Sequence, residues 1–554
     1  MNFFIPLSRF LPRGALEIDM EKNKFFDTSA YALFAGILLL ELLFIRPFGN
    51  FPLYDDWTPA LSVASFTGSG TFFYPAYLSA FSFVPILYGI AVSMVFGFSF
   101  GVLRLTTILL AWGCACLLYS FLRRSDFSVR TSIDSTLLML VSPLFVFLSN
   151  TFMSDIPGLF FLLAALYFFS RGFRERRYSL IIIGACCSLF GFFTRQFNIL
   201  LLLAGAGSYF FYPYMNRKVG MVLWGAIGLV FFGVWALIMN AGVVPATPIV
   251  LYLPPDSGQR ISQSLLFTIL IAIFFCASFA PFILARKGWM GIWRSMHSYK
   301  ALYLTLFAST ISAILYYLFP RFLTVISYFG LGTVPFFMRG DIPLWGWPAV
   351  YIIVLAGCLL LASWLFRRVS VIFDLVKEQP WNAFLLYFGV LYGLTIIIFV
   401  PFFDRYFLFF LPIICYINAY VLKKYAVSHV VYYGMLSIIA LYSIVGVYNY
   451  IGWNDARWRL GERIVTSGIP REKINGGYEW NGWFFYKDGL DGSIREGSQK
   501  NLGAYIDNFL FFRDTEYLLS FSPLTSTRVI DAENVRGLFS NIKRIYALQK
   551  INQE

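Results

Sequence analysis

Long apolar runs alternate with short polar segments from residue 28 to about residue 449. Each run holds roughly 20 residues, the length that an α-helix needs to cross the hydrocarbon core of a bilayer. The runs predict membrane-spanning helices at residues 28–47, 99–122, 133–150, 156–171, 178–194, 197–213, 219–240, 263–285, 301–319, 348–366, 381–402, 406–422 and 430–449. The pattern therefore predicts an all-α polytopic membrane protein with about 13 transmembrane helices.

Two regions interrupt this pattern. The segment 48–98 is too long for a simple turn and contains "YDDW" and "TGSGTFFYPAY". We expect short interfacial helices in this first external loop. From residue 451 to residue 554 glycine, charged and polar residues become frequent, so we divide the chain into a transmembrane domain at 1–450 and a C-terminal domain at 451–554.

The C-terminal domain has a mixed pattern. It begins with the helix-like "DARWRLGERIV" and ends with the helix-like "ENVRGLFSNIKRIYALQKI". Between them, "KINGGYEWNGWFFY" and "EYLLSFSP" have the β-branched and aromatic content typical of strands. This order predicts a small α/β or α+β domain.

Charge supports a particular orientation. The chain is 59% hydrophobic and 13% charged, with a formal net charge of +14. With the N-terminus in the cytoplasm, the loops outside the cell would carry few basic residues, namely Arg46, Arg195, Arg260, Arg321, Arg339 and Arg405. This bias follows the positive-inside rule, so the basic charge reflects topology and gives no reason to expect a nucleic-acid partner. An odd number of spans places the C-terminal domain outside, as in a protein of the bacterial inner membrane.

Histidine and glycine patterns exclude several kinds of site. The sequence has two histidines, His297 and His429, both in predicted cytoplasmic loops, which argues against a zinc or haem site built on histidine. No phosphate-binding glycine loop is present, so a soluble nucleotide has no recognisable binding loop.

The adjacent acids Asp55 and Asp56 follow the first predicted span. Two neighbouring carboxylates repel each other unless a cation, a basic side chain or solvent relieves them. One could act as a general base while the other orients a metal or a substrate hydroxyl. The alternative is a solvated loop or a helix cap before "WTPAL".

Asp155 lies in "SNTFMSDIPGLFF", in a short loop on the same side as Asp55. Helix capping by Ser154 or Asp155 would explain its presence. If Asp155 and the Asp55–Asp56 pair face one external cavity, their common position favours a functional site over capping.

Two arginines lie at the outer ends of predicted spans: Arg195 in "FFTRQFN" and Arg405 in "PFFDRYFLFFLP". A lipid-linked phosphate at the headgroup level is a partner that would justify this placement. The alternatives are side chains that extend to the membrane surface, or an ion pair between Arg405 and Asp404.

Together, "YDDW", "FGFSFGVLRLTTIL", "MSDIP", "DRYFLFFLP" and the late "INGGYEWNGW" resemble the polyprenyl-phosphate-sugar-dependent glycosyltransferases of the GT-C fold. The similarity is to the protein O-mannosyltransferase and aminoarabinose transferase-like group. It implies a membrane enzyme that moves a sugar from a polyprenyl-phosphate-linked donor to an acceptor lipid, glycan or protein, outside the cytoplasm and with inversion, in the synthesis of cell-envelope glycan, glycolipid or glycoprotein.

The resemblance also implies roles for the residues. Asp55 becomes the catalytic base and Asp56 its partner, with the two roles open to exchange, and Asp155 supports the acceptor or a metal. Arg195 and Arg405 would neutralise the donor phosphate, a task that a divalent cation held by Asp55 and Asp155 could share.

The sequence departs from the eukaryotic members in two respects. The pair is Asp-Asp where those members have Asp-Glu, and no trefoil-like domain is inserted between spans. Both differences put a protein acceptor in doubt. If the acceptor were itself a phosphate, no base would be needed and Asp55 would serve in orientation or metal binding.

Two other classes of function compete with this interpretation. A transporter or flippase of a lipid-linked or amphipathic substrate would place ionisable groups near the membrane midplane in repeated halves, whereas the acids here cluster at one boundary and no halves repeat. A non-catalytic protein that binds lipid-linked sugar would tolerate loss of the chemistry of Asp55 and Asp56.

Overall fold

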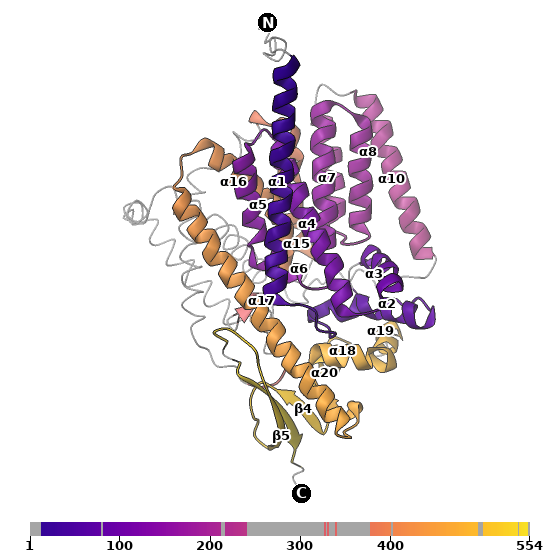
Figure 1. Cartoon of the computed structure of the whole chain (residues 1–554). Coiled ribbons are helices and arrows are strands. Elements are labelled where there is room, and N and C mark those ends of the chain that lie inside the picture. The colour runs from indigo at the N-terminus through magenta and orange to yellow at the C-terminus, as the bar shows by residue number, and fades with distance from the viewer. Residues whose placement is uncertain are drawn as a thin grey trace, which may run out of the picture.

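The computed structural model describes residues 13–78, 81–211, 216–240, 326–327, 330–331, 338–340, 377–399, 403–496, 502–540 and 542–551. Long helices lie side by side in a bundle, with the N-terminus at one end and a small sheet with the C-terminus at the other (Figure 1). The predicted spans at 263–285, 301–319 and 348–366 lie outside the described residues.

Most predicted spans in the described regions coincide with helices. These are α1 (Arg13–Ile45), α4 (Phe100–Arg124), α7 (Asp155–Glu175), α8 (Tyr178–Phe192), α9 (Asn198–Phe211), α10 (Arg217–Asn240), α15 (Ala383–Phe399), α16 (Leu411–Lys424) and α17 (His429–Thr466). Among the residues that the structure describes, six helices are long and apolar enough to cross a membrane, or seven with one bent pair. The total of about 13 spans stays a prediction.

The bent pair is α5 (Val129–Leu140) and α6 (Pro143–Ser149), which meet at 67°. Pro143 begins α6, and proline favours a helix start because it has no N–H to donate to the preceding turn. The single straight span predicted at 133–150 is therefore replaced by two helices with a sharp bend between them.

The first external loop contains short helices, as predicted. A single 3-10 turn, η2 (Tyr54–Asp56), leads into α2 (Trp57–Ser69), and α3 (Phe83–Phe96) follows. These helices lie at the end of the bundle that faces the C-terminal domain (Figure 1). Their position brings the Asp55 turn between the membrane helices and that domain.

The C-terminal domain mixes helices with a four-stranded sheet of order β3-β4-β6-β5. The strands are β3 (Ile474–Asn475), β4 (Tyr517–Ser520), β5 (Thr527–Asn534) and β6 (Arg544–Lys550); β3 pairs parallel to β4, and the other pairs are antiparallel. The helices are α18 (Tyr478–Phe485), η7 (Tyr486–Leu490), α19 (Asp491–Glu496) and α20 (Leu502–Leu510). The predicted α+β character of this domain is confirmed.

One local expectation for this domain is confirmed and two need revision. The helix-like "DARWRLGERIV" is the continuation of α17, which crosses residue 450 without a break. The strand expected at "YEWNGWFF" is the helix α18, and the helix expected near the C-terminus is the end of β5, a turn and β6. Aromatic residues indicate that a segment is buried more than they indicate its backbone conformation. Whether a segment becomes a strand depends on partner strands that are distant in the sequence.

Packing joins the C-terminal domain to the membrane helices. Trp453 of α17 and Trp480 of α18 are both fully buried, and α17 contacts β5 and β6. The sheet and α18 are therefore built on the extended end of a membrane helix.

Candidate active site at the Asp55 turn

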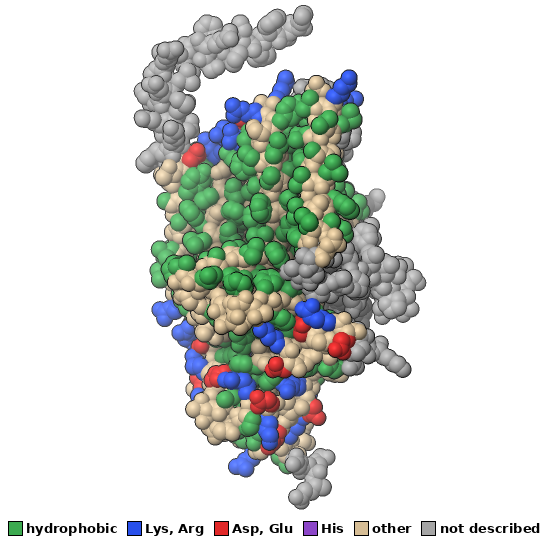
Figure 2. Space-filling model, turned by 90° about the vertical axis from the view of Figure 1, so that its right-hand side faces the viewer, with side chains coloured by type: hydrophobic (Ala, Val, Ile, Leu, Met, Phe, Trp, Pro, Cys, Tyr) green, Lys and Arg blue, Asp and Glu red, His purple; other side chains and the backbone are tan. Residues whose placement is uncertain are grey.

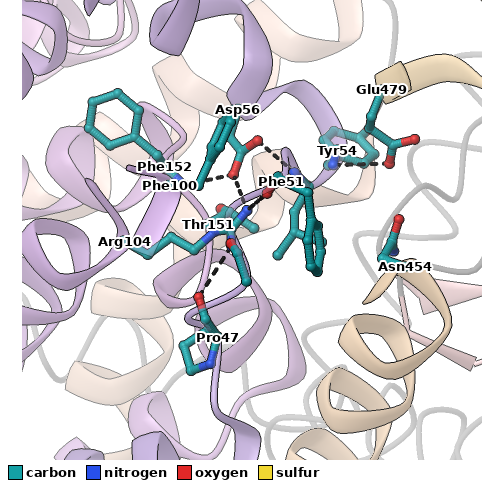
Figure 3. Close-up of polar contacts among 12 residues, drawn as sticks. Pro47, Phe51, Tyr54, Asp56, Phe100, Arg104, Thr151, Phe152, Asn454 and Glu479 are labelled. Atoms are coloured by element: carbon teal, nitrogen blue, oxygen red, sulfur yellow. Dashed lines mark hydrogen bonds and ion pairs between the residues drawn. The ribbon is translucent and has the colours of Figure 1, made fainter. Parts of the chain in front are cut away.

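The turn that carries the two adjacent acids is held by carboxylates from both sides. The N–H of Leu53 donates to Oδ1 of Asp56 over 2.6 Å, and the N–H of Tyr54 donates to Oε1 of Glu479 over 3.1 Å (Figure 3). Tyr54 has a left-handed backbone with φ of 57°. Such a conformation costs a non-glycine residue about 1–2 kcal/mol, which these hydrogen bonds help to offset.

Asp56 faces the protein interior. Its side chain is fully buried and forms an ion pair with Arg104 at 3.2 Å, while the N–H of Phe152 lies 3.4 Å from the same oxygen (Figure 3). Burial raises the pKa of Asp56 to about 6, although Arg104 lowers it in part. The carboxyl is thus ionised at neutral pH and serves to fix the turn.

Arg104 of α4 ties together the chain that leads into the turn. Besides Asp56, its guanidinium donates to the carbonyls of Pro47 at 3.2 Å, Gly49 at 2.9 Å and Phe51. The rings of Phe51 and Phe100 lie 5.7 and 5.5 Å from it. Sequence reasoning did not assign Arg104 a role; its signal was an arginine inside an apolar span, which needs a partner.

Asp55 points to a different set of partners. Its side chain is 27% exposed, and its Oδ2 accepts from Nη1 of Arg405 over 2.6 Å. Its Oδ1 accepts from the hydroxyl of Tyr478 over 2.5 Å. Each of the adjacent acids thus has its own arginine, which removes the repulsion that the dipeptide suggests.

A second ion pair lies beside the first. Asp155, fully buried at the start of α7, pairs with Arg195. The guanidinium carbons of Arg195 and Arg405 lie 5.6 and 5.8 Å from the centre of the same ring, that of Tyr406. The two ion pairs therefore meet at the ring of Tyr406 through their arginines, while the fifth predicted site residue, Asp56, holds the turn through Leu53 and Arg104.

This geometry supports the capping alternative for Asp56, whose Oδ1 accepts from the N–H of Leu53 at the start of η2. At the starts of α2 and α7, neither Asp56 nor Ser154 forms a side-chain capping hydrogen bond. Arg405, at the start of η5 (Asp404–Phe410), forms its ion pair with Asp55, 350 residues away in sequence.

Three polar atoms at this site are buried and have no hydrogen-bond partner among the residues that the structure describes: Oδ2 of Asp155, Nε of Arg195 and Nε of Arg405. Buried polar atoms are normally hydrogen-bonded. A hydroxyl could donate to the carboxylate oxygen, and an anion could accept from either arginine, so the site has unused capacity for a polar ligand.

The same residues fit a metal centre poorly. Asp55 and Asp155 are both already neutralised by arginine. Within the described regions, no three His, Cys, Asp or Glu side chains are placed so that they could hold a metal ion. A divalent cation held by Asp55 and Asp155 would require both arginines to move, and it stays a prediction to be tested by chelation.

The C-terminal domain supplies two residues that sequence reasoning missed, Tyr478 and Glu479. Glu479 is fully buried and pairs with Arg457 of α17 at 2.9 Å. Burial raises the pKa of Tyr478 well above its ordinary value, so its hydroxyl keeps its proton. The signal was present in "INGGYEWNGW", where an acid stands among aromatic residues.

Comparison with known proteins confirms the resemblance predicted from the sequence. The sequence model of the dolichyl-phosphate-mannose-protein mannosyltransferase family matches residues 86–238. This segment runs from α3 to α10 and includes Arg104, Asp155 and Arg195. No curated protein sequence matches the chain.

Solved structures show weaker likeness. The Saccharomyces cerevisiae protein O-mannosyltransferase Pmt1-Pmt2 complex bound to the sugar donor matches with 18% identity and a TM-score of 0.33, over 39% of this chain and 32% of that one. ArnT from Cupriavidus metallidurans bound to undecaprenyl phosphate matches with 14% identity and a TM-score of 0.40, over 93% of this chain and 97% of that one. The apo state of the same ArnT matches with 12% identity and a TM-score of 0.37, over 94% of this chain and 98% of that one. Superpositions this loose locate no individual residue of this chain.

Proposed function

We propose that this protein is an integral membrane glycosyltransferase that moves a sugar from a polyprenyl-phosphate-linked donor to an acceptor on the extracytoplasmic side. The observation that carries the proposal is the arrangement of Asp55, Arg405, Arg195 and Asp155 around one tyrosine ring. It combines a partly exposed carboxylate with two arginines, and the family match supports glycosyl transfer as the chemistry.

Asp55 is the group best placed to act as the base. An ionised carboxylate has about four lone-pair sites, and Arg405 and Tyr478 each use one. A remaining site can accept the proton of an acceptor hydroxyl as its oxygen attacks the anomeric carbon and the phosphate leaves. With an acceptor that is itself a phosphate, the same carboxylate would orient it without taking a proton.

Arg195 and Arg405 are suited to the phosphate of the donor. Arginine offers several donors in a fixed plane, which matches phosphate oxygens, and both arginines have an unused, buried Nε. Charge that develops on the leaving phosphate would be stabilised by donors that are already in position. We assign Asp155, whose Oδ2 is also unused, to a hydroxyl of the acceptor.

The charge distribution supports a site outside the cytoplasm. Basic residues gather where α4, α7 and α16 end, away from the C-terminal domain: Arg123, Arg124, Arg174, Lys423 and Lys424. Figure 2 shows basic side chains at the upper end of the apolar band and charges of both signs below it. The positive-inside rule then places the N-terminus in the cytoplasm, and the bacterial inner membrane is the corresponding location.

The first test is Asp55→Asn. We expect loss of sugar transfer by about 100-fold or more, the range for removal of a general base, while the variant is still expressed and folded in detergent. Asp488→Asn, an exposed acid of the C-terminal domain, is the matched control and should keep full activity. Transfer is measured with polyprenyl-phosphate-linked sugars extracted from the native membrane.

Mass spectrometry of copurified lipids separates the competing functions. A polyprenyl-phosphate sugar enriched on Asp55→Asn over wild type would identify the donor of a stalled enzyme. Equal enrichment on both proteins, with no transfer by either, would instead indicate a non-catalytic binder. Full transfer by Asp55→Asn would refute the proposed mechanism.

A further inference from the structure

We propose that Tyr478 of the C-terminal domain is a positioning residue for Asp55, so that the active site is completed by a domain outside the membrane bundle. The proposal rests on the role of Asp55 proposed above. Tyr478 and Asp55 lie 423 positions apart in the sequence, and their side chains meet at 2.5 Å.

The carboxylate of Asp55 is held at both oxygens. Arg405 donates to Oδ2 over 2.6 Å, and Tyr478 donates to Oδ1 over 2.5 Å. One partner alone would leave the carboxylate free to rotate about the bond to its Cβ. Two partners on opposite oxygens fix its plane, which is what a base needs before it can receive a proton from a bound hydroxyl.

The ring of Tyr478 is itself held in place. It stacks on Phe511 with ring centres 4.9 Å apart and meets Trp57 edge-on at 5.9 Å. Gly477, just before it, has φ of 89°, a conformation that favours glycine and allows the chain to turn from β3 into α18. The hydroxyl therefore has one well-determined position.

The next residue anchors the helix that carries Tyr478. Glu479 accepts from Nη1 of Arg457 over 2.9 Å and from the N–H of Tyr54 over 3.1 Å. Neighbouring residues of α18 thus contact neighbouring residues of the Asp55 turn, one through Asp55 and one through Tyr54. This double contact aligns the turn with the C-terminal domain.

The same domain holds a second part of the first external loop. The N–H of Tyr77 donates to the hydroxyl of Tyr486 over 2.7 Å, and the N–H of Ala76 donates to Oδ1 of Asp491 over 2.8 Å. These bonds place the hydroxyl of Tyr77 at 3.3 Å from that of Tyr478. The hydroxyl of Tyr77 therefore lies next to the hydroxyl that contacts Asp55.

The test compares Tyr478→Phe with two other tyrosine variants. Tyr486→Phe removes a contact to the loop but none to Asp55, and Tyr546→Phe changes a partly buried tyrosine of β6. Because a hydrogen bond to a charged group is worth more than a neutral one, we expect Tyr478→Phe to lower kcat about tenfold while the KM for donor changes less than twofold. Tyr546→Phe should keep kcat within about twofold. Tyr486→Phe should lower kcat less than Tyr478→Phe does, because the loop loses one hydrogen bond while Asp55 keeps both of its own.

The pH profile distinguishes positioning from simple structural support. A hydrogen bond donated to a carboxylate favours its ionised form. Loss of the hydroxyl should therefore move the acidic limb of the kcat profile to higher pH in Tyr478→Phe, and leave it in place in Tyr486→Phe and Tyr546→Phe. A reduced kcat with an unmoved acidic limb would overturn the proposal.

A double-mutant cycle of Tyr478→Phe with Asp55→Asn provides a readout that does not need activity. Residues in contact give non-additive changes in stability, so we expect the shifts in thermal midpoint not to add. Additive shifts would overturn the contact. If Asp55→Asn is inactive and Tyr478→Phe resembles wild type in kcat and pH profile, the positioning role fails while the proposed function stands. An active Asp55→Asn instead refutes the proposed role of Asp55 as the base, and absence of transfer by the wild-type protein refutes the proposed function.

Discussion

Two adjacent carboxylates at the Asp55 turn have different surroundings and should respond differently to the same change. Asp56 is fully buried against Arg104, whereas the side chain of Asp55 is 27% exposed between Arg405 and Tyr478. A base must be exposed to reach its substrate, and Asp55 is. A fully buried ion pair such as that of Asp56 is tolerated only when both charges are well paired.

Asp56→Asn is therefore expected to impair folding more than catalysis. Removing one partner of a buried ion pair typically costs about 3–5 kcal/mol because the remaining charge is uncompensated, here that of Arg104. The thermal midpoint in detergent should fall further than that of Asp55→Asn, because Asp56 is fully buried while the side chain of Asp55 is 27% exposed. The double variant Asp56→Asn with Arg104→Met should recover part of the loss, since it removes the uncompensated charge; a double variant no more stable than the single one would contradict this account.

In the proposed mechanism Arg405 contacts both the base, Asp55, and the donor phosphate, so its removal should affect both. In Arg405→Ala the donor concentration for half-maximal rate should rise about tenfold, as expected for the loss of a charged hydrogen bond, and kcat should fall because Asp55 loses a partner. The measurement is initial rate against donor concentration. Arg528→Ala, an exposed arginine of β5, is the control, and equal donor dependence in both variants would exclude Arg405 from the phosphate site.

At the scale of elements, the docking of α18 on α2 decides whether Tyr478 reaches Asp55. Gly482 of α18 lies so close to Trp57 of α2 that an added Cβ would be 2.6 Å from its ring. Trp57 also contacts the rings of Tyr77 and Tyr486, at 5.7 and 5.3 Å. This indole is thus the centre of the contact between the first external loop and the C-terminal domain.

Gly482→Ala should consequently loosen this contact. The added methyl cannot be accommodated without moving α18 or Trp57, and overpacking of this kind costs about 1–3 kcal/mol. We expect a lower thermal midpoint and a lower transfer rate. Gly492→Ala in α19 is the matched control, because a Cβ there meets nothing within 4 Å. Equal behaviour of the two variants would show that close packing at Trp57 is unimportant.

At the scale of the whole molecule, the two ends of the bundle differ in chemistry. One end carries basic residues at the ends of α4, α7 and α16, and the other carries the Asp55 turn and the C-terminal domain (Figure 1). A polyprenyl-phosphate donor would reach the site from the membrane while an acceptor arrives from the aqueous side.

This arrangement predicts that cysteines placed at the two ends of the bundle differ in their reaction with a reagent that cannot cross the membrane. In a cysteine-free background, Asp488→Cys in the C-terminal domain should react with a membrane-impermeant maleimide in intact cells. Lys218→Cys, at the start of α10, should react only after permeabilisation; both side chains are exposed. Labelling of Lys218→Cys in intact cells, with protection of Asp488→Cys, would reverse the proposed orientation.

The sequence by itself determined the membrane class, most of the apolar helices in the described regions and the acids and arginines that are candidates for the site. These features are local: a run of apolar residues specifies a spanning helix without reference to distant partners, and charges are so rare in this chain that each external acid or arginine could be weighed singly.

The tertiary structure alone decided the partner of each charge and the shape of the C-terminal domain. Asp55 meets Arg405 and Tyr478, and Asp56 meets Arg104, across separations of 350, 423 and 48 positions that no periodicity encodes. For the same reason β6 was predicted as a helix and α18 as a strand, because strand pairing and burial against Trp57 are set by chain segments far away in the sequence.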